Sequence, residues 1–231
     1  MKALLYKEFK LAMHPICYIF IFVFPFMILI PSYPLAVGFI YVLSCYPILF
    51  LGANKGQQSN DLLYSTLLPV RKKDIVLARM LTVIIIQFTY IAMMSALYPL
   101  AWFLKDFIKD DGGEMVLNAG IPLTGYVSVL AFALIGFAIA DLIFFPIYYK
   151  HGRSIVASTL SMILGFIIYL AIFTIGLPYI PVAGEWFLAT FADGHRLWIQ
   201  FIFLTGALGI YALIHLAVYK ISAKRLEKVD F

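Results

Sequence analysis

The chain has 231 residues, of which 64% are hydrophobic and only 13% are charged, and its net charge is +5. A water-soluble domain of this length needs a far more charged surface, so the composition excludes one. It indicates a single integral membrane domain over residues 1–231.

The N-terminal segment is predicted to form an amphipathic helix at the membrane surface. Within residues 1–14, Leu5 and Phe9 share one helical face, and Lys7, Glu8 and Lys10 supply the charges. Such a helix is typical of the cytoplasmic headgroup layer.

Six apolar stretches follow, and each approaches the roughly 20 residues that a transmembrane helix needs. We therefore expect an all-α, polytopic fold with six spans. The predicted spans cover residues 16–30, 35–53, 80–104, 121–149, 154–177 and 197–219. Between the last two spans, two prolines, two flanking glycines and several aromatic residues in 176–191 predict a broken external segment.

The distribution of basic residues predicts the orientation. Fourteen of the seventeen Lys and Arg residues lie in the N-terminal segment, in residues 54–79, in residues 150–153 and in the C-terminal tail. The positive-inside rule therefore places both termini in the cytoplasm and the chain in the plasma membrane. No basic face with interleaved aromatic residues lies outside the spans, so we expect no nucleic-acid partner.

The polar segment at residues 54–79 separates the second and third predicted spans. Ser59 or Asn60 can cap a short helix, and Pro69 would end it. We predict a cytoplasmic coupling helix that stands off the membrane, although an ordinary solvated loop held by anionic lipid is the alternative. The coupling residues predicted here are Asp61, Leu62, Leu63, Leu67, Pro69, Arg71, Lys72 and Asp74.

The sequence carries no recognisable catalytic motif. It has no phosphate-binding loop ending in Gly-Lys-Ser/Thr, so the chain by itself should not hydrolyse ATP in the usual way. Its four histidines are scattered over different segments, and Cys17 and Cys45 lie inside apolar stretches. We expect a chain that is not an enzyme and that binds no metal or cofactor of its own.

Asp141 is the one carboxylate inside a predicted span, and such residues often serve a function. It lies about two turns from Lys150 and Arg153, so a structural role near the inner headgroups is the interpretation we favour. A proton relay would need a second acid at membrane depth.

Three residues of the third predicted span, Gln87, Tyr90 and Met94, share one helical face. Together with Asp141 they are the candidates for lining a cavity. The alternative is that they join helices to one another.

Three motifs resemble the permease subunits of type-2 ATP-binding-cassette exporters. They are Leu-Leu-Tyr-Lys-Glu-Phe-Lys at residues 4–10, Leu-Leu-Pro-Val-Arg-Lys-Lys-Asp at 67–74 and Phe-Pro-Ile-Tyr-Tyr-Lys-His-Gly at 145–152. The chain is most similar to the small bacterial six-span branch that includes exporters of amphipathic peptides such as phenol-soluble modulins.

This resemblance implies a dimer of two permease chains, identical or paralogous, each docked on a separate ATPase subunit that binds ATP and Mg²⁺. Lys7, Glu8, Lys10 and residues 61–74 would then sit in a groove of the ATPase. The implied substrates are amphipathic peptides, drugs or lipid-like molecules, and the implied roles are peptide export and antimicrobial resistance. Two other functions stay open, namely a substrate-capture subunit of a small-nutrient importer and a membrane-embedded immunity or sensor protein.

Overall fold

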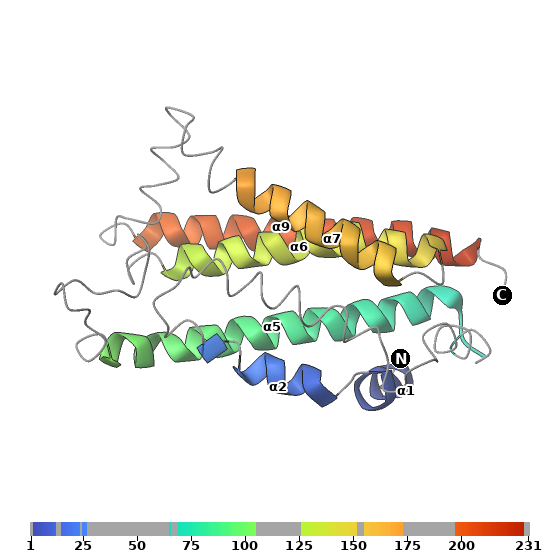
Figure 1. Ribbon diagram of the computed structural model, residues 1–231, viewed down its shortest axis with the longest axis horizontal. Coiled ribbons are helices and arrows are strands. Elements are labelled where there is room, and N and C mark those ends of the chain that lie inside the picture. The colour runs from blue at the N-terminus through green and yellow to red at the C-terminus, as the bar shows by residue number, and fades with distance from the viewer. Residues whose placement is uncertain are drawn as a thin grey trace.

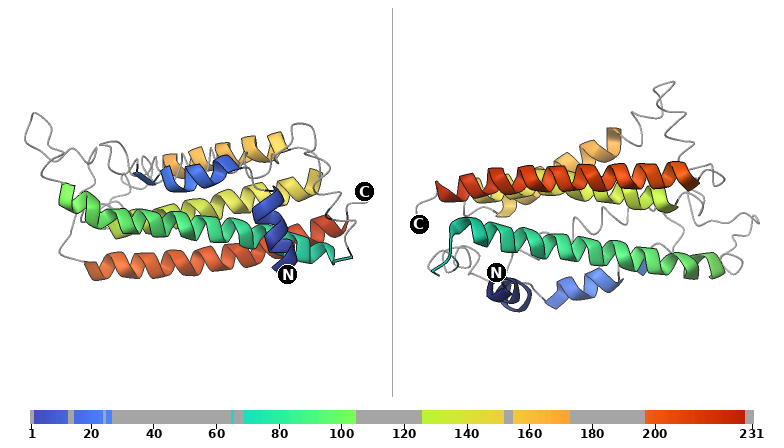
Figure 2. Two further views of the ribbon diagram at one scale, coloured as in Figure 1. Left: turned by 90° about the horizontal axis from the view of Figure 1, so that it is seen from below. Right: turned by 180° about the vertical axis from the view of Figure 1, so that it is seen from behind.

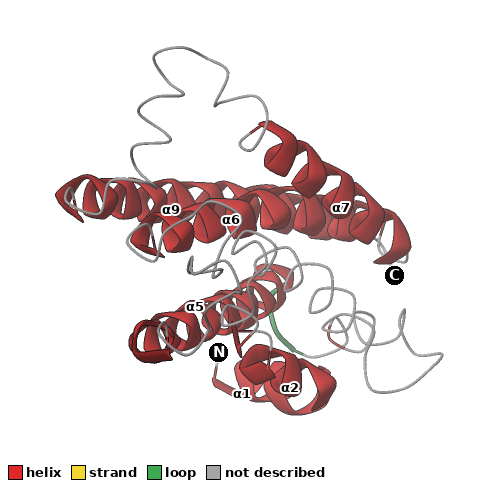
Figure 3. Ribbon diagram, turned by 60° about the vertical axis from the view of Figure 1, so that its left-hand side comes forward, coloured by secondary structure: helices red, strands yellow, loops and turns green. Residues whose placement is uncertain are grey.

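The computed structural model describes residues 2–12, 15–23, 25–26, 65, 69–104, 126–151, 155–172 and 197–228. The regular elements in these residues are all helical (Figure 3), as the sequence predicts. They are α1 (Lys2–Lys7), the π-helix η1 (Glu8–Ala12), α2 (Pro15–Val23), α5 (Lys72–Leu104), α6 (Tyr126–His151), α7 (Ile155–Ala171) and α9 (Leu197–Glu227). The predicted span at 35–53 and the predicted external segment at 176–191 lie outside these residues, so the six-span topology stays a prediction.

Among the described residues, three helices are long and apolar enough to cross a membrane. The qualifying stretches are Lys72–Leu97, Val127–Lys150 and Trp198–Glu227, and the shortest has 24 residues. At a rise of 1.5 Å per residue this is about 36 Å, which exceeds the roughly 30 Å hydrocarbon core of a bilayer. Val156–Ala171 is a shorter apolar helix.

Two of these helices extend further than the apolar pattern predicts. The third predicted span was to begin at residue 80, but α5 begins at Lys72; the last was to end at 219, but α9 continues to Glu227. Lysine and arginine side chains can reach the headgroup layer from within a helix, so basic residues do not end one. At the start of α5, the backbone N–H of Asp74 donates to the carbonyl of Arg71 at 2.8 Å, and Asp74 supplies the negative charge that favours a helix N-terminus.

The described helices form two groups, and α5 lies between them (Figure 1). α6 and α9 run side by side along much of their length, and α7 packs on α6. α5 lies between this group and the pair α1 and α2, and Figure 2 shows α1 crossing α5 near the start of α5.

One end of the bundle contains the start of α5, the ends of α6 and α9, and the N-terminal helix (Figure 1). We call it the basic end, because it carries Lys72, Lys73, Lys150, Lys224 and Arg225. By the N-terminal helix we mean α1 together with η1.

The core that α5, α6, α7 and α9 share is rich in aromatic side chains. Phe137, Phe144, Phe145 and Tyr149 of α6 are fully buried. Tyr90 of α5 meets Phe137 edge to face, with ring centroids 6.1 Å apart. Outward faces of α7 and α9 expose many large apolar residues, as expected for surfaces that contact lipid or a second membrane chain.

Close packing of α7 on α6 depends on a glycine. A Cβ atom at Gly136 would lie 2.9 Å from Cε2 of Phe166 and 3.2 Å from Cε1 of Tyr169. Tyr169 has little freedom to move away, because its hydroxyl donates to the carbonyl of Phe132 at 2.8 Å. We predict that Gly136→Ala lowers the midpoint of thermal unfolding in detergent.

The matched control for this substitution is Gly206→Ala in α9, where a Cβ would meet no atom within 4 Å. Alanine favours a helix over glycine by roughly 0.5–1 kcal/mol, so this control should be neutral or slightly stabilising. Equal stability of the two variants would contradict the tight contact at Gly136.

Candidate functional site

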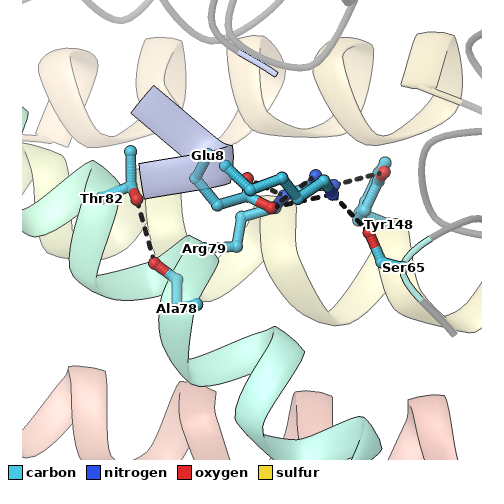
Figure 4. Close-up of polar contacts among 7 residues, drawn as sticks. Glu8, Ser65, Ala78, Arg79, Thr82 and Tyr148 are labelled. Carbon is cyan, nitrogen blue, oxygen red and sulfur yellow. Dashed lines mark hydrogen bonds and ion pairs between the residues drawn. The ribbon is translucent and has the colours of Figure 1, made fainter. Parts of the chain in front are cut away.

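A buried ion pair joins the N-terminal helix to α5 (Figure 4). Arg79 donates from Nε to Oε2 of Glu8 at 2.9 Å and from Nη2 to Oε1 of Glu8 at 3.2 Å. Only 6% of the Arg79 side chain and 5% of the Glu8 side chain are exposed. Two parallel hydrogen bonds fix the relative orientation of the two groups as well as their distance.

Three further side chains complete this cluster. Arg79 Nη1 donates to the hydroxyl of Tyr148 on α6 at 3.1 Å. Lys7 Nζ contacts Oε1 of Glu8 at 3.4 Å and donates to Oγ of Ser65. We call Lys7, Glu8, Ser65, Arg79 and Tyr148 the clamp, because they connect the N-terminal helix, the 54–79 segment, α5 and α6.

The charged residues of the N-terminal helix do not all face water, contrary to the amphipathic pattern. The amphipathic pattern predicts that Lys7 and Glu8 face water, yet both are buried, and Glu8 begins the wider π-helical turn η1. Arg79 sits inside an apolar helix and needs a counter-charge, because removing a charge from water without one is very costly. Glu8 supplies that charge. Lys10 stays exposed, and its Nζ donates to the hydroxyl of Tyr6 at 2.5 Å.

The other predicted coupling residues differ in their exposure, and four of them lie outside the described residues. Pro69 and Arg71 are exposed, and Arg71 lies 3.6 Å from Asp74 in a surface ion pair. Lys72 is half-buried, and its Nζ donates to the backbone carbonyl of Glu227 on α9 at 3.5 Å. The remaining four predicted coupling residues, Asp61, Leu62, Leu63 and Leu67, lie outside the described residues.

A second polar cluster joins three of the long helices. Asp141 of α6 accepts a hydrogen bond from Gln87 Nε2 at 2.9 Å, and its Oδ2 lies 2.8 Å from His215 Nε2. The hydroxyl of Tyr211 donates to Gln87 Oε1 at 2.5 Å, and His215 Nδ1 lies 2.8 Å from the Tyr211 carbonyl. We call Gln87, Asp141, Tyr211 and His215 the central cluster; its four side chains are buried.

The structure gives Asp141 a different partner from the one that the sequence suggests. Lys150 follows Asp141 by nine positions, which corresponds to about 14 Å along a helix and so to roughly half of a 30 Å hydrocarbon core. The partner of Asp141 is His215 rather than a basic residue near the headgroups. A signal for this pairing exists, since His215 also precedes a lysine, Lys224, by nine residues on a helix that runs in the same direction.

The cavity candidates of the third predicted span are all buried against neighbouring helices. Gln87 bonds Asp141 and Tyr211, and Tyr90 packs on Phe137. Met94 is part of the buried core. Within the described part of the chain, no three His, Cys, Asp or Glu side chains are grouped so that they could hold a metal ion.

The chain matches a known protein family over most of its length. The profile of the family described as ABC-2 family transporter protein matches residues 3–226, which include both clusters and nearly the whole chain. No curated protein and no solved structure matches significantly.

The clamp predicts what Arg79→Gln does. Arg79→Gln removes both parallel hydrogen bonds to Glu8 and leaves that carboxylate with Lys7 alone, at 3.4 Å. A hydrogen bond to a charged group contributes about 1.5–3 kcal/mol. We expect this variant to release the N-terminal helix, so that trypsin cleaves after Lys7 faster than in the wild-type chain.

Arg71→Gln is the matched control, because Arg71 is 76% exposed and its pair with Asp74 is long. Surface pairs contribute at most about 1 kcal/mol, so cleavage after Lys7 should be unchanged in this variant. Wild-type cleavage rates in both variants would show that the clamp does not hold the helix.

Proposed function

The chain belongs to the ABC-2 family of transporter proteins as a membrane permease component, and we propose that it serves an exporter. In this proposal it moves amphipathic peptides, drugs or lipid-like molecules out of the cell by alternating access. The family implies an ABC ATPase partner, which would bind ATP and Mg²⁺ and supply the energy.

The proposal assigns the basic end of the bundle to the cytoplasm, in agreement with the positive-inside rule. The N-terminal helix, Pro69 and Arg71 would then face the compartment that contains ATP. Of the N-terminal helix, Lys2, Tyr6 and Lys10 are exposed, whereas Lys7 and Glu8 are used inside the chain. The expected contact with the ATPase therefore narrows to the exposed side of this helix and to residues 61–74.

The observation that carries this proposal is the buried Glu8–Arg79 pair. ATP can drive a permease only if the ATPase contacts differ between two states and if the displacement reaches the membrane helices. The pair connects a helix that is exposed at the basic end to α5, and Tyr148 extends the connection to α6. A push on the exposed side of the N-terminal helix would thus displace two long helices.

A second permease chain belongs to this proposal, in a homodimer or a heterodimer. The outward side of α9 is compatible with such a partner, because Trp198 and Leu213 are more than 60% exposed. The same surface is equally suited to lipid, so the dimer rests on the family resemblance.

If the ATPase contacts the exposed side of the N-terminal helix, the double variant Tyr6→Ala/Lys10→Ala should weaken that contact. When the chain is co-expressed with its ABC ATPase partner, this variant should retain much less ATPase on an affinity column than wild type. Scrambling residues 61–74 should also abolish copurification.

In the wild-type complex, a synthetic amphipathic helical peptide should stimulate ATP hydrolysis.

The matched control is Trp198→Ala, which removes an exposed aromatic side chain at the opposite end of the bundle. It should retain the ATPase as well as wild type does. An isolated chain that binds no ATPase but holds a small nutrient tightly would contradict the exporter and favour the importer subunit.

A further inference from the structure

The hydrogen bonds of the central cluster fix the number of its protons. The carbonyl of Tyr211 can only accept, so Nδ1 of His215 must carry a hydrogen. The 2.8 Å contact between His215 Nε2 and Asp141 Oδ2 then needs one proton between them. Whether this proton resides on the ring or on the carboxyl group, the pair as a whole has no net charge.

Neutrality is what the location of the pair demands. Asp141 is fully buried at a depth where a lone carboxylate is strongly disfavoured. An ordinary histidine is partly protonated near neutral pH, whereas an ordinary aspartic acid is almost fully ionised. His215 therefore supplies the shared proton at much lower cost than Asp141 would by becoming protonated alone.

The cluster also ties α5 to the other two helices. Gln87 is its residue from α5, and the Gln87 amide both donates to Asp141 of α6 and accepts from Tyr211 of α9. Moving α5 away would break both bonds and leave polar groups without partners at membrane depth, which is costly.

Two other contacts hold the same helices nearer the basic end. Arg79 of α5 donates to Tyr148 of α6, and Lys72 of α5 donates to the Glu227 carbonyl of α9. α6 and α9 are joined in turn, because Arg225 Nη1 donates to the carbonyl of Pro146 at 2.5 Å. Polar contacts thus connect α5 to its neighbours at three depths.

We infer that α5, α6 and α9 move as one rigid body during transport. At mid-membrane they are held together by Gln87 and by the Asp141–His215 pair, which shares one proton and has no net charge. This connection follows from the geometry of the cluster, whereas its role in transport rests on the proposed function. Access to the substrate path then changes between this body and other parts of the permease.

The shared proton is tested by thermal unfolding of three variants of the full chain in detergent. His215→Gln leaves the carboxylate without its proton source, and it should lower the midpoint by about 10 °C or more. Asp141→Asn leaves two neutral groups that can still bond, and it should lower the midpoint by less than about 5 °C. The double variant Asp141→Asn/His215→Gln should be more stable than His215→Gln alone.

Rescue by the second substitution is the decisive outcome, because loss of packing alone would make the two single effects add. The comparison remains informative if His215→Gln does not fold. In that case the double variant should fold although the single variant does not. Additive effects, or equal effects of the two single substitutions, would overturn the shared proton.

The rigid body is tested by a reversible cross-link between α5 and α9 at a place outside the proposed ATPase contact. Phe88 of α5 and Leu208 of α9 are both partly exposed, and Leu208 lies one turn from Tyr211, whose ring centroid is 5.5 Å from that of Phe88. Phe88→Cys and Leu208→Cys are combined with replacement of Cys17 and Cys45 by alanine, and the new thiols are joined with a bis-methanethiosulfonate linker. ATP turnover is measured in the complex with the ATPase before and after the linker is released by reductant. The released protein is the control for the linked one.

We expect ATP turnover by the linked complex to stay within about twofold of turnover after release. Turnover that stops on linking and returns on reduction would show that α5 and α9 move apart, and would overturn the rigid body. A chain that binds no ATPase even when unlinked would instead contradict the proposed function, and the thermal series would still decide the shared proton.

Discussion

Charged side chains inside an apolar helix bundle must find their counter-charges within the chain, because the surrounding hydrocarbon offers none. Arg79 and Asp141 are the two residues that impose this constraint most strongly. The first is satisfied by Glu8 and Tyr148, and the second by His215 and Gln87. Each solution recruits side chains from other helices, so satisfying a charge also joins parts of the chain that are distant in sequence.

Both clusters use α5, and this gives α5 a central place in the mechanism. Arg79 of α5 binds the N-terminal helix, and Gln87, eight positions further along, binds α6 and α9. Eight residues correspond to about 12 Å along the helix, so the two connections lie at different depths and resist tilting as well as sliding. A displacement that enters at the exposed N-terminal helix can therefore reach the middle of the membrane without passing through a loop.

Helix type and the approximate position of the spans were predictable, because an apolar stretch of about 20 residues has few alternatives to a membrane helix. Pro15 begins α2, because proline is tolerated in the first turn of a helix. The ends of α5 and α9 were not predictable from apolarity, since basic residues such as Lys72 and Lys224 remain helical while their charges reach outward.

The clusters were harder to foresee than the spans. The amphipathic pattern assigned Glu8 to the water-facing side, and only the burial of Arg79 reverses that assignment. His215 carried no local motif, because its partner lies 74 positions earlier in the chain. Pairings of this kind depend on which helices are neighbours, and a single sequence states that only indirectly.

The central claim is that the N-terminal helix and α5 are mechanically continuous. It is tested most directly by the distance between spin labels on the N-terminal helix, at Ala3, and on the far part of α5, at Leu100, both of which are exposed. The labels are placed in a chain whose native cysteines, Cys17 and Cys45, are replaced. The distance is measured in the complex with the ATPase partner, first without nucleotide and then trapped with ATP. The account predicts the same distance distribution in both states, and a shift of several ångströms between them would contradict it.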